Sequence, residues 1–176
     1  MPPGHLLNSY WGGQGHFRPA VDVLLRGREE VVLSRRAVLD SGSPYIAFDE
    51  QVAKDLGLRP PFARKVVGHG VGGQETLLSF PEDGEVQILL TDYVNGYCLW
   101  APLVGFLLRE STTPEPEGTV NQRAILGMTG FFQHLDVSFR HGSNPGIEVE
   151  VGSDFPGLSG KGKPPRGVWT LLQRPA

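Results

Sequence analysis

Short runs of β-branched and aliphatic residues, separated by residues that favour turns, recur along most of the chain. The runs with this pattern are residues 19–25, 31–33, 37–39, 65–80, 85–91, 97–108 and 135–139. Such runs favour strands, while the Gly, Pro, Asn and Asp residues between them favour tight turns. Asn95-Gly96 is typical of a two-residue hairpin turn, and residues 65–80 predict a hairpin with a glycine-rich tip. The pattern predicts a mainly β protein.

Two short segments have a helical pattern instead. Asp49 is a suitable N-cap for a helix over residues 49–58, and Gly57 is suited to end it. The apolar positions that share one face of this segment are Val52, Ala53 and Leu56. Residues 129–134 predict a second short helix, followed by the last strand.

The chain of 176 residues fits one domain, and it contains no internal repeat. We expect an N-terminal arm over residues 1–18, a folded domain over 19–142 and a C-terminal, largely flexible tail over 143–176. The tail is expected because Gly, Pro and Lys dominate residues 152–166, which offer little apolar surface to bury. The apolar residues 168–172 are an exception that is able to dock on the domain or on a partner.

Composition and charge narrow the class of protein. The 24 Gly and 15 Pro favour short strands and turns over long helices, and the net charge of −3 gives no indication of a nucleic-acid partner. The one cysteine, Cys98, lies in an apolar run and is expected to be a buried, inert thiol. No signal peptide is evident, and the longest uncharged run, residues 93–108, is short and broken. We therefore expect a cytoplasmic protein without a membrane partner.

Residues 37–43 are the segment that indicates chemistry. The apolar residues Ala37-Val38-Leu39 lead directly into Asp40-Ser41-Gly42-Ser43. A carboxylate at the end of an apolar strand is costly unless it is hydrogen-bonded or used. The two serines supply hydroxyls beside it, and Gly42 permits a tight turn. Asp40 is therefore the candidate catalytic group.

Asp40-Ser41-Gly42-Ser43 resembles the Asp-Thr/Ser-Gly-Ala/Ser signature of aspartic proteases. The surroundings resemble the retropepsin-like, single-domain branch of that family, over roughly residues 19–140. In that branch the motif is followed by a short helix that ends near a leucine–glycine pair, here in residues 49–58. A glycine-rich flap follows about thirty residues after the acid, here at 70–73, and two aliphatic residues and a glycine precede a second short helix, here at 125–127.

This resemblance implies a closed β-barrel-like acid protease fold with a flap hairpin and one or two short helices, one lobe per chain. It implies catalytic roles for Asp40, Ser41 and Gly42. The implied substrate-binding residues are Ser43, Gly70, Val71, Gly72 and Gly73, and the residues implied to support the active site are Ile125, Leu126 and Gly127. It implies neither a metal nor a cofactor.

The implied activity is that of an aspartic endopeptidase, which hydrolyses peptide bonds with a water activated by two carboxylates. Two carboxylates held about 3 Å apart share one proton, because they do not both ionise readily; the aspartic-protease pair is a standard example of this effect. The Asp-Ser-Gly motif occurs once in this chain. A C2 homodimer is the simplest way to bring Asp40 to the Asp40 of a second copy, with a peptide or protein as substrate.

Some features depart from the family's usual pattern. Met128-Thr129 follows the Ile-Leu-Gly segment, where the family commonly has Arg or Asn and then Asp or Asn, and Pro44 follows the catalytic turn. The loop over 111–118 and the tail after His141 have no match in the compact viral enzymes. These departures bear on the substrate specificity and the catalytic efficiency that the resemblance implies.

The sequence is compatible with other interpretations. One is a retropepsin-like dimerisation or peptide-binding module that is catalytically weak or inactive, which peptide cleavage by the wild type beside Asp40→Asn would separate from an enzyme. In the other, Asp40 is a turn acid that caps its own loop. Residues 68–73 also fit the pattern G-x-G-x-x-G, but the strand character of residues 74–80 disfavours the helix that a dinucleotide site requires.

Overall fold

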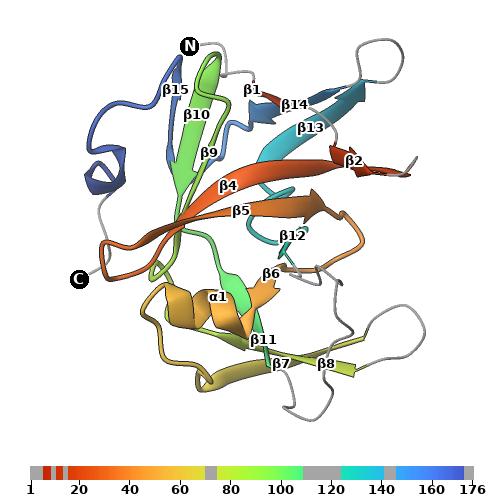
Figure 1. Ribbon diagram of the computed structural model, residues 1–176, viewed down its shortest axis with the longest axis vertical. Coiled ribbons are helices and arrows are strands. Elements are labelled where there is room, and N and C mark those ends of the chain that lie inside the picture. The colour runs from red at the N-terminus through yellow and green to blue at the C-terminus, as the bar shows by residue number, and fades with distance from the viewer. Residues whose placement is uncertain are drawn as a thin grey trace.

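Figure 1 shows the computed structural model, which describes residues 6–8, 11–13, 16–69, 75–108, 124–140 and 146–172. The elements in chain order are β1 (Leu6–Asn8), β2 (Trp11–Gly13), β3 (His16–Arg18), β4 (Ala20–Arg26), β5 (Val32–Leu39), β6 (Ile46–Asp49), α1 (Glu50–Asp55), β7 (Arg64–His69), β8 (Glu75–Phe80), β9 (Gln87–Thr91), β10 (Gly96–Trp100), β11 (Val104–Leu108), β12 (Ala124–Leu126), β13 (Leu135–Arg140), β14 (Gly146–Val151), β15 (Leu158–Lys161) and the 3-10 helix η1 (Val168–Thr170). The prediction of a mainly β protein is confirmed.

The strands form one large sheet and two small ones. The large sheet has ten strands in the order β15-β10-β9-β4-β5-β12-β6-β11-β8-β7, a second sheet has the order β1-β14-β13, and β2 pairs with β3. A closed barrel requires its first and last strands to pair. Among the described strands, β15 and β7 are the two ends of the sheet order and do not pair, so the expected closed barrel is not found. Among the described strands, β15 pairs with β10 and β7 pairs with β8.

Alternation of apolar and polar residues explains how the long strands bury one face. Along β4, Val21, Val23 and Leu25 are buried while Asp22 faces solvent. Asp22 is opposite Arg36 of β5 and accepts hydrogen bonds of 2.8 and 3.0 Å from its guanidinium. These bonds raise the pKa of Arg36 above its ordinary value. The pair is therefore a cross-strand ion pair on the solvent-facing side of the β4–β5 ladder.

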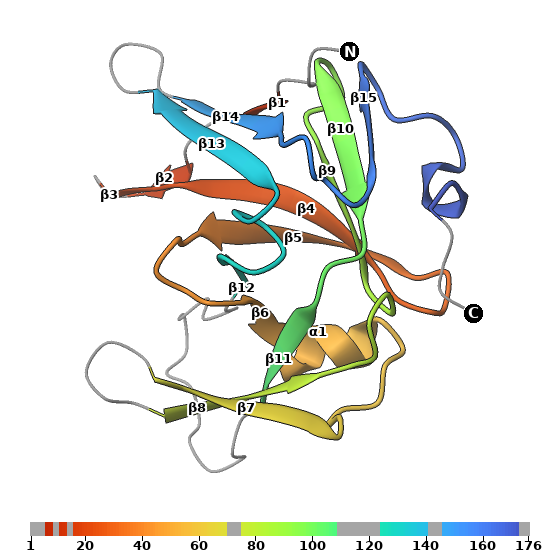
Figure 2. The ribbon, with the colours of Figure 1, turned by 180° about the vertical axis from the view of Figure 1, so that it is seen from behind.

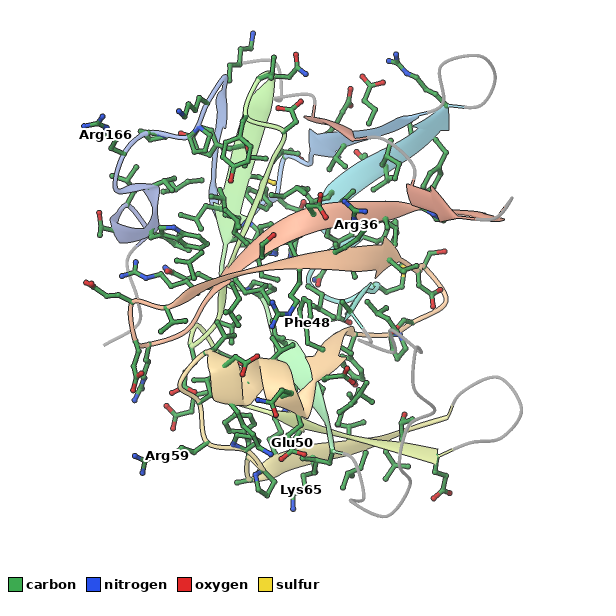
Figure 3. The ribbon with its side chains drawn as sticks, in the orientation of Figure 1. Arg36, Phe48, Glu50, Arg59, Lys65 and Arg166 are labelled. Atoms are coloured by element: carbon green, nitrogen blue, oxygen red, sulfur yellow. The ribbon has the colours of Figure 1, made fainter. Side chains whose placement is uncertain are left out.

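Aromatic side chains fill the middle of the core. Phe48, Trp100, Phe106 and Phe131 are fully buried, and Figure 3 shows Phe48 inside the molecule while Arg59 and Arg166 lie at its edge. The indole N–H of Trp100 donates to the carbonyl oxygen of Gly130 at 2.8 Å. A buried aromatic stabilises by its large apolar area, provided that its polar group has a partner, and here that condition is met.

The first predicted helix forms, and it is shorter than expected. It covers Glu50–Asp55, with Val52 and Ala53 buried, and Gly57 follows it at φ +77°. Asp49 occupies the N-cap position but its side chain makes no cap hydrogen bond, and it belongs to β6. Asp49 is buried at the end of β6, and the expectation of a side-chain cap there is wrong.

Residues 129–134, expected as a second helix, form a series of turns instead. Gln133 N–H donates to Met128 O at 2.9 Å, and Leu135 N–H donates to Phe131 O at 3.0 Å. Gly130, at φ +90°, interrupts the regular helical backbone, and Phe131 is drawn into the core beside Trp100. The packing of the Phe131 ring, rather than the local preference for a helix, therefore determines the conformation of this segment.

The hairpin predicted over 65–80 is present as β7 and β8. Arg64–His69 pairs with Glu75–Phe80 in antiparallel register. Gly70, Val71, Gly72 and Gly73 lie outside the described residues, so the role of the hairpin as a flap stays a prediction. No helix in the described parts of the chain is long and apolar enough to cross a bilayer.

The segments outside residues 19–142 are more ordered than expected. β1 pairs with β14 and β14 pairs with β13, so one strand before the expected domain and one after it belong to the same sheet. β15 pairs with β10, as Figure 2 shows from behind. The described part of the expected flexible tail is therefore folded; the boundaries at 18 and 142 stay a prediction.

Glycine in the expected tail marks close packing. A Cβ on Gly157 would lie 2.2 Å from Leu99 O, and one on Gly160 would lie 2.7 Å from the Tyr97 ring. These two positions have no room for a side chain, because their backbone lies directly against β10. The docking expected of the apolar segment 168–172 is confirmed, since Val168 is buried against Leu89 and Leu99.

Buried residues of β14 test directly whether the segment after residue 142 is folded. Ile147 is fully buried, so Ile147→Ala should lower the free energy of unfolding by about 2–5 kcal/mol, because it leaves a cavity in the core. Ser153→Ala, on an exposed residue that follows the same strand, should change it by no more than about 0.5 kcal/mol. Denaturant melts of the three proteins check this, and an unchanged Ile147→Ala melt would show that β14 does not fold onto the core.

The thiol of Cys98 is buried, as predicted. Burial raises the pKa of Cys98 above its ordinary value, and a hydrogen bond with the backbone of Leu90 opposes this only in part. The native protein at pH 8 should therefore react with a thiol reagent far more slowly than the denatured chain, since the thiolate is the reactive form. Because the unfolded thiol ionises at about pH 8.5, stability should fall as the pH rises above that value. Rapid native labelling would contradict this assignment.

Candidate functional site

Asp40 lies directly after β5, in the loop that leads to β6. Leu39, the last residue of β5, is 5% exposed, while Asp40, Ser41 and Gly42 are exposed. The strand therefore passes from the core to the surface within one residue. The sequence suggested a buried acid; in a single chain the carboxylate faces solvent.

Hydrogen bonds within the loop orient the carboxylate. Gly42 N–H donates to Asp40 Oδ1 at 2.9 Å, and Ser43 N–H donates to Asp40 O at 3.1 Å. The Ser43 hydroxyl donates to Tyr45 O at 3.1 Å. A Cβ on Gly42 would lie 3.1 Å from Asp40 Oδ1. Glycine at this position therefore lets the backbone N–H approach the acid without crowding it.

Strand β12 inserts between the two strands that flank this loop. It runs parallel to β5, with Ile125 opposite Val38 and Leu126 opposite Leu39, and antiparallel to β6. Strands β5 and β6 follow each other in sequence, so the loop between them must pass around the end of β12. The Ile-Leu-Gly segment is thereby brought to the base of the Asp40 loop.

The backbone after β12 clamps both sides of the loop. Asp40 N–H donates to Leu126 O at 3.1 Å, Met128 N–H donates to Ser43 O at 2.8 Å, and Thr129 N–H donates to Pro44 O at 3.0 Å. All three bonds join main-chain atoms. Segment 126–129 therefore holds the loop through main-chain bonds, in addition to the bonds that the loop's own side chains make.

Gly127 is the point of closest approach in this clamp. A Cβ there would lie 2.2 Å from Tyr45 O and 2.6 Å from Ser43 O. No side chain fits those distances without moving the loop. The structure thus gives Gly127, predicted as a supporting residue, a specific physical requirement.

The sequence did not identify the roles of Tyr45, Met128 and Thr129. Met128 and Thr129 contribute their N–H groups, while their side chains are exposed, and Tyr45 packs its ring edge-on against Phe80 at 5.2 Å. Because main-chain donors do not depend on the side chain, the departure from the family's pattern at 128–129 leaves the clamp intact. No residue-type signal in the sequence marks such donors.

A single chain does not enclose the acid. Surface hollows of about 720 and 350 Å³ occur elsewhere, the first beside the end of α1 and the second beside Trp100, and neither is lined by residues 40–43. Within the described residues, no cluster of three His, Cys, Asp or Glu side chains is placed to bind a metal ion. The structure brings Asp40, Ser41, Gly42 and Ser43 together with residues 125–127, on an open surface.

Substitution at Gly127 tests the clamp. Gly127→Ala should lower the free energy of unfolding by about 1–3 kcal/mol or more, because its methyl group displaces the backbone of Tyr45. Met128→Ala is the matched control, since it removes an exposed side chain and keeps the donating N–H, and it should change stability by no more than about 0.5 kcal/mol. Equal unfolding free energies for both variants would mean that the loop accommodates a Cβ at residue 127.

Comparison with known proteins gives a limited result. No protein-family model matches the chain, and no curated protein matches it. Among solved structures, it is similar to a retropepsin-like aspartic protease from Rickettsia conorii, with 15% sequence identity and a TM-score of 0.43 over 85% of this chain and 92% of that chain. At this identity and TM-score, the likeness does not place the chain in that family.

Proposed function

We propose that this protein is an aspartic endopeptidase that hydrolyses peptide bonds with a water activated by Asp40 and the Asp40 of a second copy. The observation that carries the proposal is the Asp40 loop itself. An acid at the end of a buried strand is oriented by the Gly42 N–H and clamped by a strand that arrives from far along the chain. A turn acid that only caps its loop requires no such clamp.

The chemistry proposed for the pair follows from shared protonation. Two carboxylates held close together retain one proton between them, because ionisation of both is unfavourable. The ionised member takes a proton from water, whose oxygen attacks the scissile carbonyl, and the protonated member polarises that carbonyl. The Ser41 hydroxyl is proposed to hydrogen-bond across the two-fold axis and hold the loops together.

The remaining parts of the proposal concern substrate binding. Ser43 and the tip residues 70–73 are proposed to contact the peptide, and β7 and β8 form the base of the hairpin that carries the tip. A flap that closes over the bound peptide excludes water from the reaction, and glycines make such a movement easy. The substrate is a peptide or protein, and no metal or cofactor takes part in the proposed step.

Asp40→Asn tests the assignment. It keeps an acceptor for the Gly42 N–H but removes the acid, so peptide cleavage should fall by about 10²- to 10⁴-fold or more while the melt changes little. Asp83→Asn is the control, because Asp83 is also an exposed turn residue, and it should keep full activity. Wild-type activity should follow a bell-shaped pH profile on the acidic side of neutral, since the rate falls when both carboxylates are ionised or both protonated.

Mixing the wild type with Asp40→Asn tests whether two chains share one active site. Excess Asp40→Asn chains should suppress wild-type activity, because each mixed dimer has one acid, and a statin-type inhibitor should compete with the substrate. Full activity of Asp40→Asn would end the assignment. Inactivity of the wild type on peptides, with a dimer that still forms, would instead identify a binding module with the same architecture. Constant specific activity in a monomeric sample would contradict the shared site.

A further inference from the structure

The turn between β9 and β10 presents two apolar side chains to solvent. Tyr93 is 52% exposed and Val94 is 72% exposed, the largest fraction among the exposed large apolar side chains of the described residues. Single exposed apolar residues are common on protein surfaces, whereas these two are adjacent and lie at the end of a hairpin. Neither of the two surface hollows is lined by them. We call this pair the apolar tip.

Hydrogen bonds hold the apolar tip in one conformation. Asp92 Oδ1 accepts the N–H groups of Val94 and Asn95 at 2.9 and 2.8 Å, and Thr91 Oγ1 accepts the N–H of Tyr93 at 2.9 Å. Tyr93 has φ +62°, a left-handed conformation that is uncommon for a bulky residue. The turn is therefore ordered before any partner binds, which lowers the entropic cost of association.

Exposed cations lie directly beside the apolar tip. The N–H of Gly162 donates to Asn95 O at 2.9 Å, so the end of β15 is fastened to the turn. Lys161 and Lys163 flank that glycine, and Arg166 follows in the same loop; all three side chains are exposed. In the described part of the chain, no acid forms an ion pair with these three residues. We call them the cationic loop.

The charge at this end of the molecule differs in sign from that of the whole chain. The chain has a net charge of −3, yet residues 155–176 contain four Lys or Arg and no Asp or Glu. The acid in the turn, Asp92, accepts hydrogen bonds from the turn itself, including one of 2.6 Å from the Asn95 amide. An anionic surface is therefore attracted to this end selectively.

The figures place the two features together. In Figures 1 and 2 the β9–β10 turn and the end of β15 lie at the same extremity of the molecule, remote from β7 and β8. Figure 3 shows Arg166 on the outer side of the loop after β15, while Arg59 and Lys65 lie near the opposite end. The apolar tip and the cationic loop therefore face the same surroundings.

An anionic lipid bilayer matches this combination of groups. Tyrosine is favoured at the level of the lipid headgroups, an apolar side chain gains by leaving water, and lysines are attracted to anionic lipids. A stable protein partner, by contrast, buries a much larger area than two side chains at a hairpin end provide. We propose that the apolar tip and the cationic loop bind the surface of an anionic phospholipid bilayer, with Tyr93 and Val94 inserted among the headgroups.

This inference goes beyond the proposed catalysis and does not depend on it. From the sequence alone we expected no membrane partner, because the two features are far apart in the chain and come together only where β15 pairs with β10. The proposed binding is peripheral, and it uses a turn and a loop in place of a spanning segment.

Vesicle flotation tests the cationic loop. The wild type should bind vesicles of equimolar phosphatidylcholine and phosphatidylserine and not vesicles of phosphatidylcholine alone, and added salt should weaken the binding by screening the charges. Lys161→Gln combined with Lys163→Gln should weaken it about tenfold or more. The matched control combines Arg59→Gln with Lys65→Gln, which removes two exposed cations from the opposite end, and it should bind like the wild type.

Substitution and labelling test the insertion of the apolar tip. Val94→Ser should weaken binding about fivefold or more, because it removes apolar area that the bilayer would cover. Val67→Ser is its control, since Val67 is also exposed, at 52%, and lies on β7. Because Cys98 is buried, Val94→Cys provides one accessible thiol for a polarity-sensitive dye. The dye emission should shift to the blue with phosphatidylserine vesicles, and a dye on Val67→Cys should not respond.

The outcomes separate this inference from its alternatives. It is overturned if the wild type binds both kinds of vesicle equally or neither, if Val94→Ser binds like Val67→Ser, or if the dye at residue 94 does not respond. Binding to a single-stranded oligonucleotide or an acidic peptide without binding to the vesicles would identify another partner and would also overturn it. Asp40→Asn should bind the vesicles like the wild type, so cleavage and vesicle binding report on the two proposals separately.

Discussion

The backbone clamp between segment 126–129 and the Asp40 loop is the constraint on which the rest of the site depends. Strand β12 separates β5 from β6, and three main-chain hydrogen bonds fasten the loop around its end. A Cβ at Gly127 would lie 2.2 Å from the carbonyl oxygen of Tyr45, so this position has no room for a side chain. Since the bonds join main-chain atoms, the loop conformation tolerates side-chain change at 128–129 and does not tolerate a side chain at 127.

The clamp positions the acid and leaves it exposed. Leu39 is buried and Asp40 faces solvent, so one chain supplies an oriented carboxylate on an open surface. The shared-site proposal accounts for that arrangement, because a second copy would supply both the other acid and the enclosure.

The end of the chain shows why composition misleads in this fold. Residues 152–166 are rich in Gly, Pro and Lys, and that composition favours disorder when it is considered without its surroundings. In the structure, Gly157 and Gly160 lie against β10, and the alternating apolar residues Ile147 and Val149 are buried. The sequence alone does not distinguish a glycine that is required for close packing from a glycine in a flexible linker.

The sequence by itself determined the local features: the mainly β character, the first helix with its buried face, the β7–β8 hairpin, the buried Cys98 and the candidate acid at the end of an apolar strand. These depend on alternation, turn residues and short motifs, which are properties of neighbouring residues. Tertiary structure decided the open order of the large sheet, the turns at 129–134, the folding of β14 and β15, and the exposure of Asp40. It also decided the clamp, because hydrogen bonds between main-chain atoms about 85 residues apart leave no mark on the types of residue that make them.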